Sequence, residues 1–353
     1  MIRHSGFDCL SYNKHYFFDI FRWLMTMKID WLRGCATALV TPFQADLSVD
    51  EDCFRHLVER QIEGGVKLLV SCGTTGESAT MSEEERLSVI RVTVEVVRAK
   101  SAETRIDNAE FISEMSHELS VDDAKTEVGK LIPRVIAGTG GNSTSATVEF
   151  TKKAQDLGIN MALVVAPYYN KPTQEGLYQH FKTVAEAAPD LPIMLYNVPG
   201  RTASNISAET TVRLARDCEN IVATKEASGN LSQIMEIIKN RPANFAVFSG
   251  DDAVTLPLIA LGADGAVSVA SNEIPELMSE MTNAALDRDF AKAREIHYRI
   301  LPLMEANFIE SSPAPVKFVM KEMRLLEETL RLPLVPVTDK SREILRSVLR
   351  EIQ

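Results

Sequence analysis

Short apolar runs recur along the chain, and a segment with helical periodicity follows each of them. Their hydrophobic character is continuous rather than alternating, and many contain β-branched residues. This pattern is typical of strands that are buried on both faces, as in parallel sheets. The predicted strands are Cys35–Thr41, Lys67–Ser71, Arg134–Ala137, Met161–Ala166, Ile193–Tyr196, Ile221–Thr224, Phe245–Ser249 and Gly265–Val269.

Amphipathic segments occupy the intervals between these strands. Several begin at a residue that favours the first position of a helix, such as Ser82 in "MSEEE" and Ser207 in "ISAET". The predicted helices are Val49–Glu63, Ser82–Val97, Thr144–Asp156, Gln174–Glu186, Ser207–Arg216, Leu231–Lys239 and Asp252–Leu261.

Most successive strands start about 20 to 32 residues apart, which is the length of a βα unit. Eight such units predict an α/β fold, a (β/α)8 TIM barrel over residues 31–272. A doubly wound sheet is the alternative, and it would need a phosphate-binding glycine loop after an early strand. The "GTGGNS" segment at 138–143 lacks the required glycine spacing, and no acidic residue follows at the distance expected for ribose binding.

Residues 1–30 form an N-terminal extension outside this repeat. The segment "HYFFDIFRWLMTM" is aromatic and apolar, but Asp19 and Arg22 interrupt it, and no cleavage site follows an apolar core. A signal peptide is therefore not expected. We expect translation to start at Met25 or Met27, with the preceding residues extra or disordered, and the alternative is an amphipathic helix lying on a membrane surface.

Two further segments depart from the repeat. Residues 101–131 are polar and acidic, and we expect a surface insertion with one short helix. Within residues 273–353, the segment "PELMSEMTNAALDRDFAKAREIHYRILPLMEANF" (275–308) carries apolar side chains at i, i+3 and i+4. This pattern predicts a C-terminal region that is helical throughout and packs beyond the barrel.

Composition narrows the function classes. An apolar fraction of 45% and a charged fraction of 25% are typical of a globular protein with a sizeable core. A net charge of −11 argues against nucleic-acid binding. The five cysteines contain no C-x-x-C pair and the six histidines lack metal-ligand spacing, so we expect no disulfide and no metal, and a cytoplasmic location. No apolar run reaches the roughly 18 residues of a membrane span, and no membrane partner is expected.

Polar residues gather where the predicted strands end, and active sites of such barrels lie at that end. Single positions have plainer explanations: "GTTGE" (73–77) as a turn and helix cap, the Tyr168–Tyr169 pair as packing, and Arg201 as a surface charge. We keep such an explanation for Asp251 and Asp252, a helix start, and for His180, helix packing. The others converge on one rim, which favours a site. Its candidate residues are Thr74, Thr75, Tyr169, Tyr196, Arg201, Lys225 and Gly250.

In the stretch "IVATKEASGN", the predicted apolar strand Ile221–Thr224 is followed immediately by Lys225. One explanation is a strand-end lysine whose stem packs while its ammonium reaches water. The other is a nucleophile. A free lysine has a pKa of about 10.4 and is neutral in roughly one molecule in a few thousand at pH 7, so a nucleophilic lysine needs a desolvating site such as a barrel interior.

Such a lysine attacks a ketone to form an iminium, which makes the neighbouring carbon acidic. A phenol such as Tyr196 can carry protons, with Thr74 and a second tyrosine linking it to water. The threonine amides and Arg201 can hold carboxylates. The combination indicates Schiff-base aldol chemistry on an α-keto acid.

At these motifs the chain resembles the dihydrodipicolinate synthase family, among the pyruvate-dependent class I aldolases that include N-acetylneuraminate lyase. The resemblance covers about residues 32–352 apart from the insertion. It rests on "GTTGESAT" (73–80), "VIAGTGGNST" (135–144), "APYYNKPTQEGLYQHF" (166–181), "YNVPGRT" (196–202), "KEASGN" (225–230), "SGDD" (249–252) and "GAVSVASN" (265–272).

The resemblance implies condensation of pyruvate with L-aspartate-4-semialdehyde to 4-hydroxy-tetrahydrodipicolinate, in diaminopimelate and lysine biosynthesis, by a cytoplasmic homotetramer without metal or organic cofactor. The implied roles are Lys225 as the Schiff-base lysine, Thr74, Tyr169 and Tyr196 as a proton relay with Tyr169 supplied to the neighbouring subunit, Thr75 on the pyruvate carboxylate, Arg201 on the semialdehyde carboxylate, and Gly250 and Val267 lining the pocket. The arginine in "NVPGRT" favours the synthase over sialic-acid or sugar-acid lyases, which remain the alternative. A non-catalytic keto-acid-binding barrel is the alternative from another class.

The resemblance also bears on regulation. In lysine-inhibited members the effector pocket uses residues matching Ser78, Ala79, Asn142 and Tyr168. Here Glu83 stands where many sensitive enzymes have histidine, and Ala146 where they have a lysine-binding glutamate. We therefore expect weak or absent inhibition by lysine.

Overall fold

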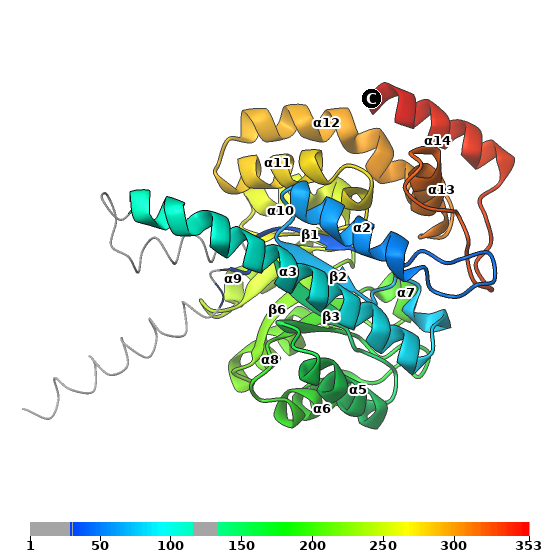
Figure 1. The fold of residues 1–353 in the computed structure, drawn as a ribbon. Coiled ribbons are helices and arrows are strands. Elements are labelled where there is room, and N and C mark those ends of the chain that lie inside the picture. Colours follow the sequence, from blue (N-terminus) through cyan, green and yellow to red (C-terminus); the bar gives the residue numbers. More distant parts are fainter. Residues whose placement is uncertain (1–28, 30, 116–132, 353) are drawn as a thin grey trace, which may run out of the picture.

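The computed structural model describes residues 29, 31–115 and 133–352, and within them eight parallel strands form a closed barrel (Figure 1). Each strand pairs with the next along the chain, and β8 pairs with β1 to close the ring. The predicted fold class is confirmed, and every predicted strand is present. The strands are β1 (Gly34–Ala38), β2 (Leu68–Ser71), β3 (Arg134–Gly138), β4 (Met161–Val165), β5 (Ile193–Asn197), β6 (Ile221–Glu226), β7 (Ala246–Ser249) and β8 (Gly265–Ser268).

Helices surround this barrel, and most begin and end within two residues of the predicted bounds. The predicted helix Asp252–Leu261 is divided into a 3₁₀ turn, Asp252–Val254, and α10 (Thr255–Ala260). The other helices of the barrel are α2 (Glu51–Glu63), α3 (Glu83–Met115), α5 (Thr144–Asp156), α6 (Gln174–Ala187), α7 (Pro199–Thr202), α8 (Ala208–Asp217) and α9 (Leu231–Asn240).

Helix α3 is longer than predicted. The expected insertion begins at residue 101, but α3 continues without interruption to Met115. The segment "RAKSA" at 98–102 contains no glycine or proline, so nothing local ends the helix there. Residues 101–115 are therefore part of a barrel helix rather than a separate short one, while 116–131, like the extension at 1–28, lie outside the described residues.

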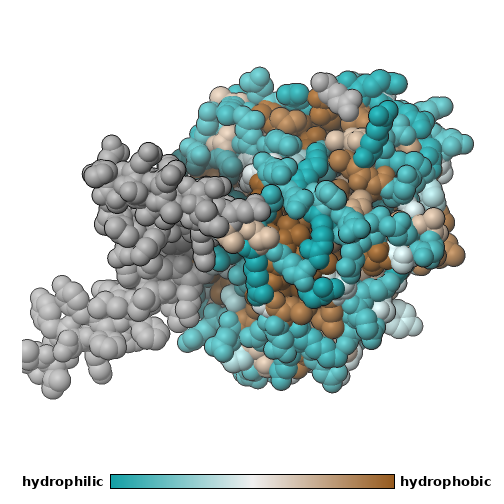
Figure 2. Space-filling view, in the orientation of Figure 1, coloured by the Kyte–Doolittle hydropathy of each residue, from teal (hydrophilic) through white to brown (hydrophobic). Residues whose placement is uncertain are grey.

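Alternation along each strand separates two apolar layers. Met194, Tyr196 and Phe248 belong to the cluster inside the barrel. Leu195 and Val247 belong to the cluster between the strands and the surrounding helices. Figure 2 shows the resulting outer surface on one side: hydrophilic residues dominate, and hydrophobic residues are visible between them. Among the described residues, no helix is long and apolar enough to cross a membrane.

The C-terminal region contains α11 (Pro275–Leu286), α12 (Phe290–Ala306), α13 (Ala314–Glu322) and α14 (Asp339–Ile352), which pack together beside the barrel (Figure 1). The prediction that this region is helical throughout is wrong. Residues 323–338, between α13 and α14, contain turns and no helix, and Pro333 and Pro336 lie among them. Because proline lacks a backbone N–H, two prolines this close oppose a helix. The division of the chain at residue 272 stays a prediction.

A buried ion pair fastens this region to the barrel. Lys317 of α13 lies 2.5 Å from Glu77, which follows β2, and both side chains are fully buried. Lys317 also donates to the Thr329 carbonyl at 2.8 Å, and the Arg331 N–H donates to Glu77 at 3.2 Å. Burial lowers the pKa of Lys317, while the nearby Glu77 carboxylate raises it. The loop that contains "GTTGE" therefore depends on the C-terminal region for its position.

Candidate active site

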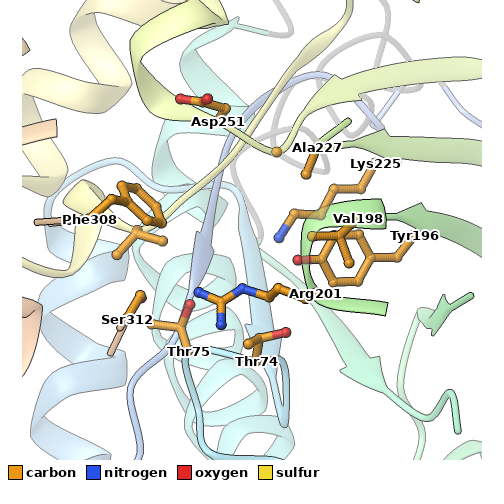
Figure 3. Close-up of a pocket in the computed structure, with 12 residues that line it drawn as sticks. Thr74, Thr75, Tyr196, Val198, Arg201, Lys225, Ala227, Asp251, Phe308 and Ser312 are labelled. Carbon is orange, nitrogen blue, oxygen red and sulfur yellow. The ribbon is translucent and has the colours of Figure 1, made fainter. Parts of the chain in front are cut away.

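A pocket of about 170 Å³ opens at the carboxyl ends of the strands. Figure 3 shows side chains from several strands and loops facing it. Six of the eight predicted site residues line it, so the structure brings these sequence motifs together. The lining residues are Thr74, Thr75, Tyr196, Val198, Arg201, Lys225, Ala227, Gly250, Asp251, Val269, Phe308 and Ser312.

Lys225 lies at the end of β6 and is 6% exposed. Its Nζ is 4.3 Å from the centroid of the Tyr196 ring, and Tyr196 is opposite Lys225 in the register of β5 and β6. In Figure 3 the ammonium and the phenol hydroxyl face the same space. A lysine this buried does not match the explanation of a strand-end cation in open water, since the barrel removes most of its hydration.

Gly250 leaves room for this lysine. A Cβ atom at position 250 would lie 2.9 Å from the Lys225 Cε and 2.7 Å from the Ala227 Cβ. Both distances are shorter than ordinary carbon contacts, so any side chain here would displace Lys225 or its neighbour. The glycine is therefore required by the close approach of the lysine stem.

The two threonines are presented by the turn after β2. The Glu77 N–H donates to the Thr74 carbonyl at 3.1 Å, and the Thr41 hydroxyl donates to the Gly76 carbonyl at 2.8 Å. Thr75 is buried and Thr74 is exposed to the pocket. Together they offer hydroxyl and backbone donors to an anionic group, in the way expected from the sequence.

Arg201 comes from α7, a single helical turn that begins with Pro199. Proline is favoured at the first position of a helix because it has no N–H to leave unpaired. The Thr202 hydroxyl fixes the end of the turn by donating to the Ser204 carbonyl at 2.8 Å. Arg201 itself is exposed, and Figure 3 shows its guanidinium directed into the pocket.

Two predicted site residues are not brought to this pocket. Tyr169 is 89% exposed, with a left-handed backbone (φ 74°), and it is not among the residues that line the pocket. Val267 is 1% exposed inside the barrel, and Val269 takes its place in the lining. The prediction that Val267 lines the pocket is therefore not matched within this chain.

Some lining residues had no sequence signal. Phe308 and Ser312 lie between α12 and α13, in a region that was expected to pack beyond the barrel. No catalytic type or strand-end position singles them out. Asp251 caps a helix start as predicted, because its carboxylate accepts from the Ala253 N–H at 3.0 Å. Its carboxylate also points away from Lys225 in Figure 3.

The remaining titratable candidates are structural. His180 is 5% exposed on α6, and its Nδ1 lies 2.9 Å from the Thr144 hydroxyl. Burial lowers the pKa of His180 to about 4, so the ring is neutral near pH 7, which agrees with the predicted packing role. Within the described parts of the chain, no three His, Cys, Asp or Glu residues gather in a way that could hold a metal ion.

A closed (β/α)8 barrel with a buried lysine, a phenol and an arginine at its strand ends is the arrangement of a class I aldolase. Residues 31–102 and 109–352 match the model of the dihydrodipicolinate synthetase family, and the chain belongs to this family. It is 48% identical over 321 residues to a 4-hydroxy-tetrahydrodipicolinate synthase of Koribacter versatilis, covering 91% of this chain and 96% of the relative. A synthase of the same name from Chloroherpeton thalassium is 45% identical over 311 residues, covering 88% of this chain and 92% of the relative.

Comparison with solved structures leads to the same family. Dihydrodipicolinate synthase from Thermotoga maritima matches with a TM-score of 0.80 at 41% identity, covering 91% of this chain and 98% of that one. The enzyme from Aquifex aeolicus matches with a TM-score of 0.79 at 42% identity, covering 90% and 97%. The similarity thus extends through both the barrel and the C-terminal helices.

Proposed function

We propose that this chain condenses pyruvate with L-aspartate-4-semialdehyde to 4-hydroxy-tetrahydrodipicolinate, a step of diaminopimelate and lysine biosynthesis. The observation that carries the proposal is the buried Lys225 ammonium beside the Tyr196 ring in a pocket at the strand ends. Family membership and relatives named 4-hydroxy-tetrahydrodipicolinate synthase support the same activity.

The first half of the reaction forms the nucleophile. The neutral Lys225 amine adds to the pyruvate carbonyl carbon, and the carbonyl oxygen leaves as water after taking up protons. The resulting iminium withdraws electrons from the adjacent methyl group, which loses a proton and becomes an enamine. Tyr196 is the proton carrier nearest to this lysine, and Thr74 completes its path.

The second half forms the carbon–carbon bond. The enamine carbon attacks the aldehyde carbon of the semialdehyde, whose oxygen takes up a proton. The amino group of the semialdehyde then attacks the iminium carbon, which closes the ring and releases Lys225 as the free amine. No oxidant, metal or organic cofactor is needed in this scheme.

The substrate carboxylates are assigned by charge and position. Thr75 holds the pyruvate carboxylate through its hydroxyl and backbone, and the exposed Arg201 receives the carboxylate of the semialdehyde by a forked contact. A solved structure of the Acinetobacter baumannii enzyme is described as complexed with pyruvate, which supports the first substrate. The role of Val267 stays a prediction: it belongs to the apolar cluster inside the barrel and is not among the lining residues.

Tyr169 completes the relay from a neighbouring subunit of a homotetramer. Its 89% exposure and its left-handed φ of 74° support this assignment, because a phenol held outward in a disfavoured conformation is expected to have a partner. One solved relative is described as a monomeric variant, and the molecular mass in solution tests the tetramer against that alternative. The cytoplasm is the proposed location, because five scattered cysteines without a C-x-x-C pair fit a reducing compartment. Weak or absent inhibition by lysine stays a prediction.

The experiment is a steady-state assay with pyruvate and each candidate acceptor. Turnover with aspartate semialdehyde, lost in Lys225→Ala and weakened in Arg201→Ala, would support the proposal. Activity with N-acetylmannosamine or a deoxy keto acid, unaffected by Arg201→Ala, would instead support a sugar-acid lyase. The same assay with added lysine tests regulation, and clear inhibition at submillimolar lysine would contradict the prediction made from Glu83 and Ala146.

A further inference from the structure

Two buried polar residues follow Tyr196 and Lys225 in the sequence, at the ends of β5 and β6. Side chains alternate along a strand, so the residue after each of them faces the helices instead of the pocket. These residues are Asn197 and Glu226, which are 0% and 1% exposed. The register of β5 and β6 pairs Tyr196 with Lys225 and Asn197 with Glu226. The polar pair is therefore the outward counterpart of the proposed catalytic pair.

The Glu226 carboxylate accepts three hydrogen bonds. Asn197 Nδ2 donates at 2.7 Å, Gln233 Nε2 at 3.3 Å and Ser228 Oγ at 2.6 Å. Burial raises the pKa of Glu226, and these three donors act in the opposite direction. Glutamate is almost never fully buried without partners, because burying a carboxylate is expensive. These three hydrogen bonds are therefore what stabilises a buried carboxylate at position 226.

The contact between Asn197 and Glu226 lies where the two strands end. The Ala227 N–H donates to the Asn197 carbonyl at 2.9 Å, and the chain after Asn197 turns into α7. Asn197 also accepts from the Ile206 N–H at 3.0 Å and donates to Asn205 Oδ1 at 2.9 Å. The Asn197 side chain thus joins the end of β5 to the end of β6 and to residues 205–206. These residues follow α7, the helical turn that contains Arg201.

We propose that the Asn197–Glu226 hydrogen bond is a positioning contact, which sets the separation of Tyr196 and Lys225. The inference rests on the proposed Schiff-base reaction. Neither residue lines the pocket, so both act through the strand ends that they join. Lys225 Nζ is 4.3 Å from the Tyr196 ring, and a displacement of about 1 Å at a reacting group can lower a rate by about a hundredfold.

The test compares two changes at one position. Glu226→Gln keeps an oxygen that can accept from Asn197 and removes the negative charge. Glu226→Met has a similar length and no oxygen. If geometry is what matters, Glu226→Met lowers kcat about ten- to a hundredfold, and Glu226→Gln stays within about threefold of the wild type. The KM for pyruvate changes much less than kcat, because the lost interaction serves the reacting groups.

A matched control separates positioning from stability. Gln61 of α2 accepts a buried hydrogen bond from the Thr37 hydroxyl of β1 at 2.7 Å, on the helix side of a strand that does not adjoin β5 or β6. Gln61→Met removes a comparable contact and is expected to lower the melting temperature without lowering kcat. Asn197→Ala breaks the proposed contact from the other strand and replaces Glu226→Met if that variant does not fold.

The outcomes decide between the two roles. Folded Glu226→Met and Asn197→Ala proteins with wild-type kcat would overturn the proposal, as would a Gln61→Met protein that loses as much kcat as Glu226→Met. Borohydride trapping with pyruvate alone gives the same comparison if the wild type does not turn over aspartate semialdehyde. A wild type that traps no pyruvate would contradict the proposed function itself, and this inference with it.

Discussion

The Glu77–Lys317 ion pair provides a quantitative test of how the C-terminal region supports the site. Lys317→Met removes the ammonium and leaves the Glu77 carboxylate fully buried, with the Arg331 N–H as its hydrogen-bond donor. Removing one partner of a buried pair typically destabilises a protein by about 3–5 kcal/mol, because the remaining charge loses its nearest counter-charge. Here Glu77 keeps only its weaker interaction with Arg331. With an unfolding entropy of about 2.1 cal/mol/K per residue over 353 residues, this corresponds to a melting temperature lower by roughly 4–7 °C.

Differential scanning calorimetry of the wild type and three variants measures this effect. Glu77→Gln combined with Lys317→Met removes both charges and is expected to regain most of the lost stability. Lys292→Met is the matched control, since it breaks the exposed pair with Glu280, in which both side chains are about half exposed, and little change is expected. A single Lys317→Met variant as stable as the wild type, or a double variant as unstable as the single, would refute the reasoning.

Three further predictions concern the pocket and its surroundings. Gly250→Ala places a Cβ atom 2.9 Å from the Lys225 Cε and should lower kcat about tenfold or more, whereas Gly200→Ala, which meets nothing within 4 Å, should leave kcat unchanged in the same assay. Arg201→Ala should raise the KM for aspartate semialdehyde roughly ten- to a hundredfold while pyruvate trapping persists, and equal loss of both would contradict its assigned role. Because burial lowers the pKa of His180 to about 4, the unfolded chain takes up the proton first, so stability should fall as pH drops from about 6.5 towards 4 by up to about 3 kcal/mol. Urea unfolding at pH 7 and pH 5 should show a smaller loss in His180→Gln, and an identical loss would contradict this.

The sequence was most informative where structure is local. Strands of a parallel barrel are apolar on both faces, so their ends, and with them Lys225 and Tyr196, could be placed from the sequence alone. Contacts between distant segments could not. Glu77 and Lys317 are 240 positions apart, and no pattern at either residue indicates the other. Phe308 could not be predicted as a pocket residue either, because its approach to the pocket depends on how the α12–α13 connection packs on the barrel.

The other differences between the sequence-based predictions and the structure also have physical causes. The end of α3 differs from the prediction, because the composition changes at residue 101 while no helix-breaking residue is present there. The apolar pattern predicts helix throughout the C-terminal region, but the connection before α14 contains none, because Pro333 and Pro336 oppose a helix. The resemblance implies that Val267 lines the pocket; in this chain Val267 lies inside the barrel and Val269 is in the lining, so its role stays a prediction.

The central claim is that Lys225 is the nucleophile, and one measurement tests it most directly. The protein is treated with borohydride in the presence and absence of pyruvate, and its peptides are analysed by mass spectrometry. The account predicts a pyruvate-dependent adduct on the peptide that contains Lys225, absent in Lys225→Ala. A folded wild-type protein without an adduct, or with the adduct on another lysine, would contradict it.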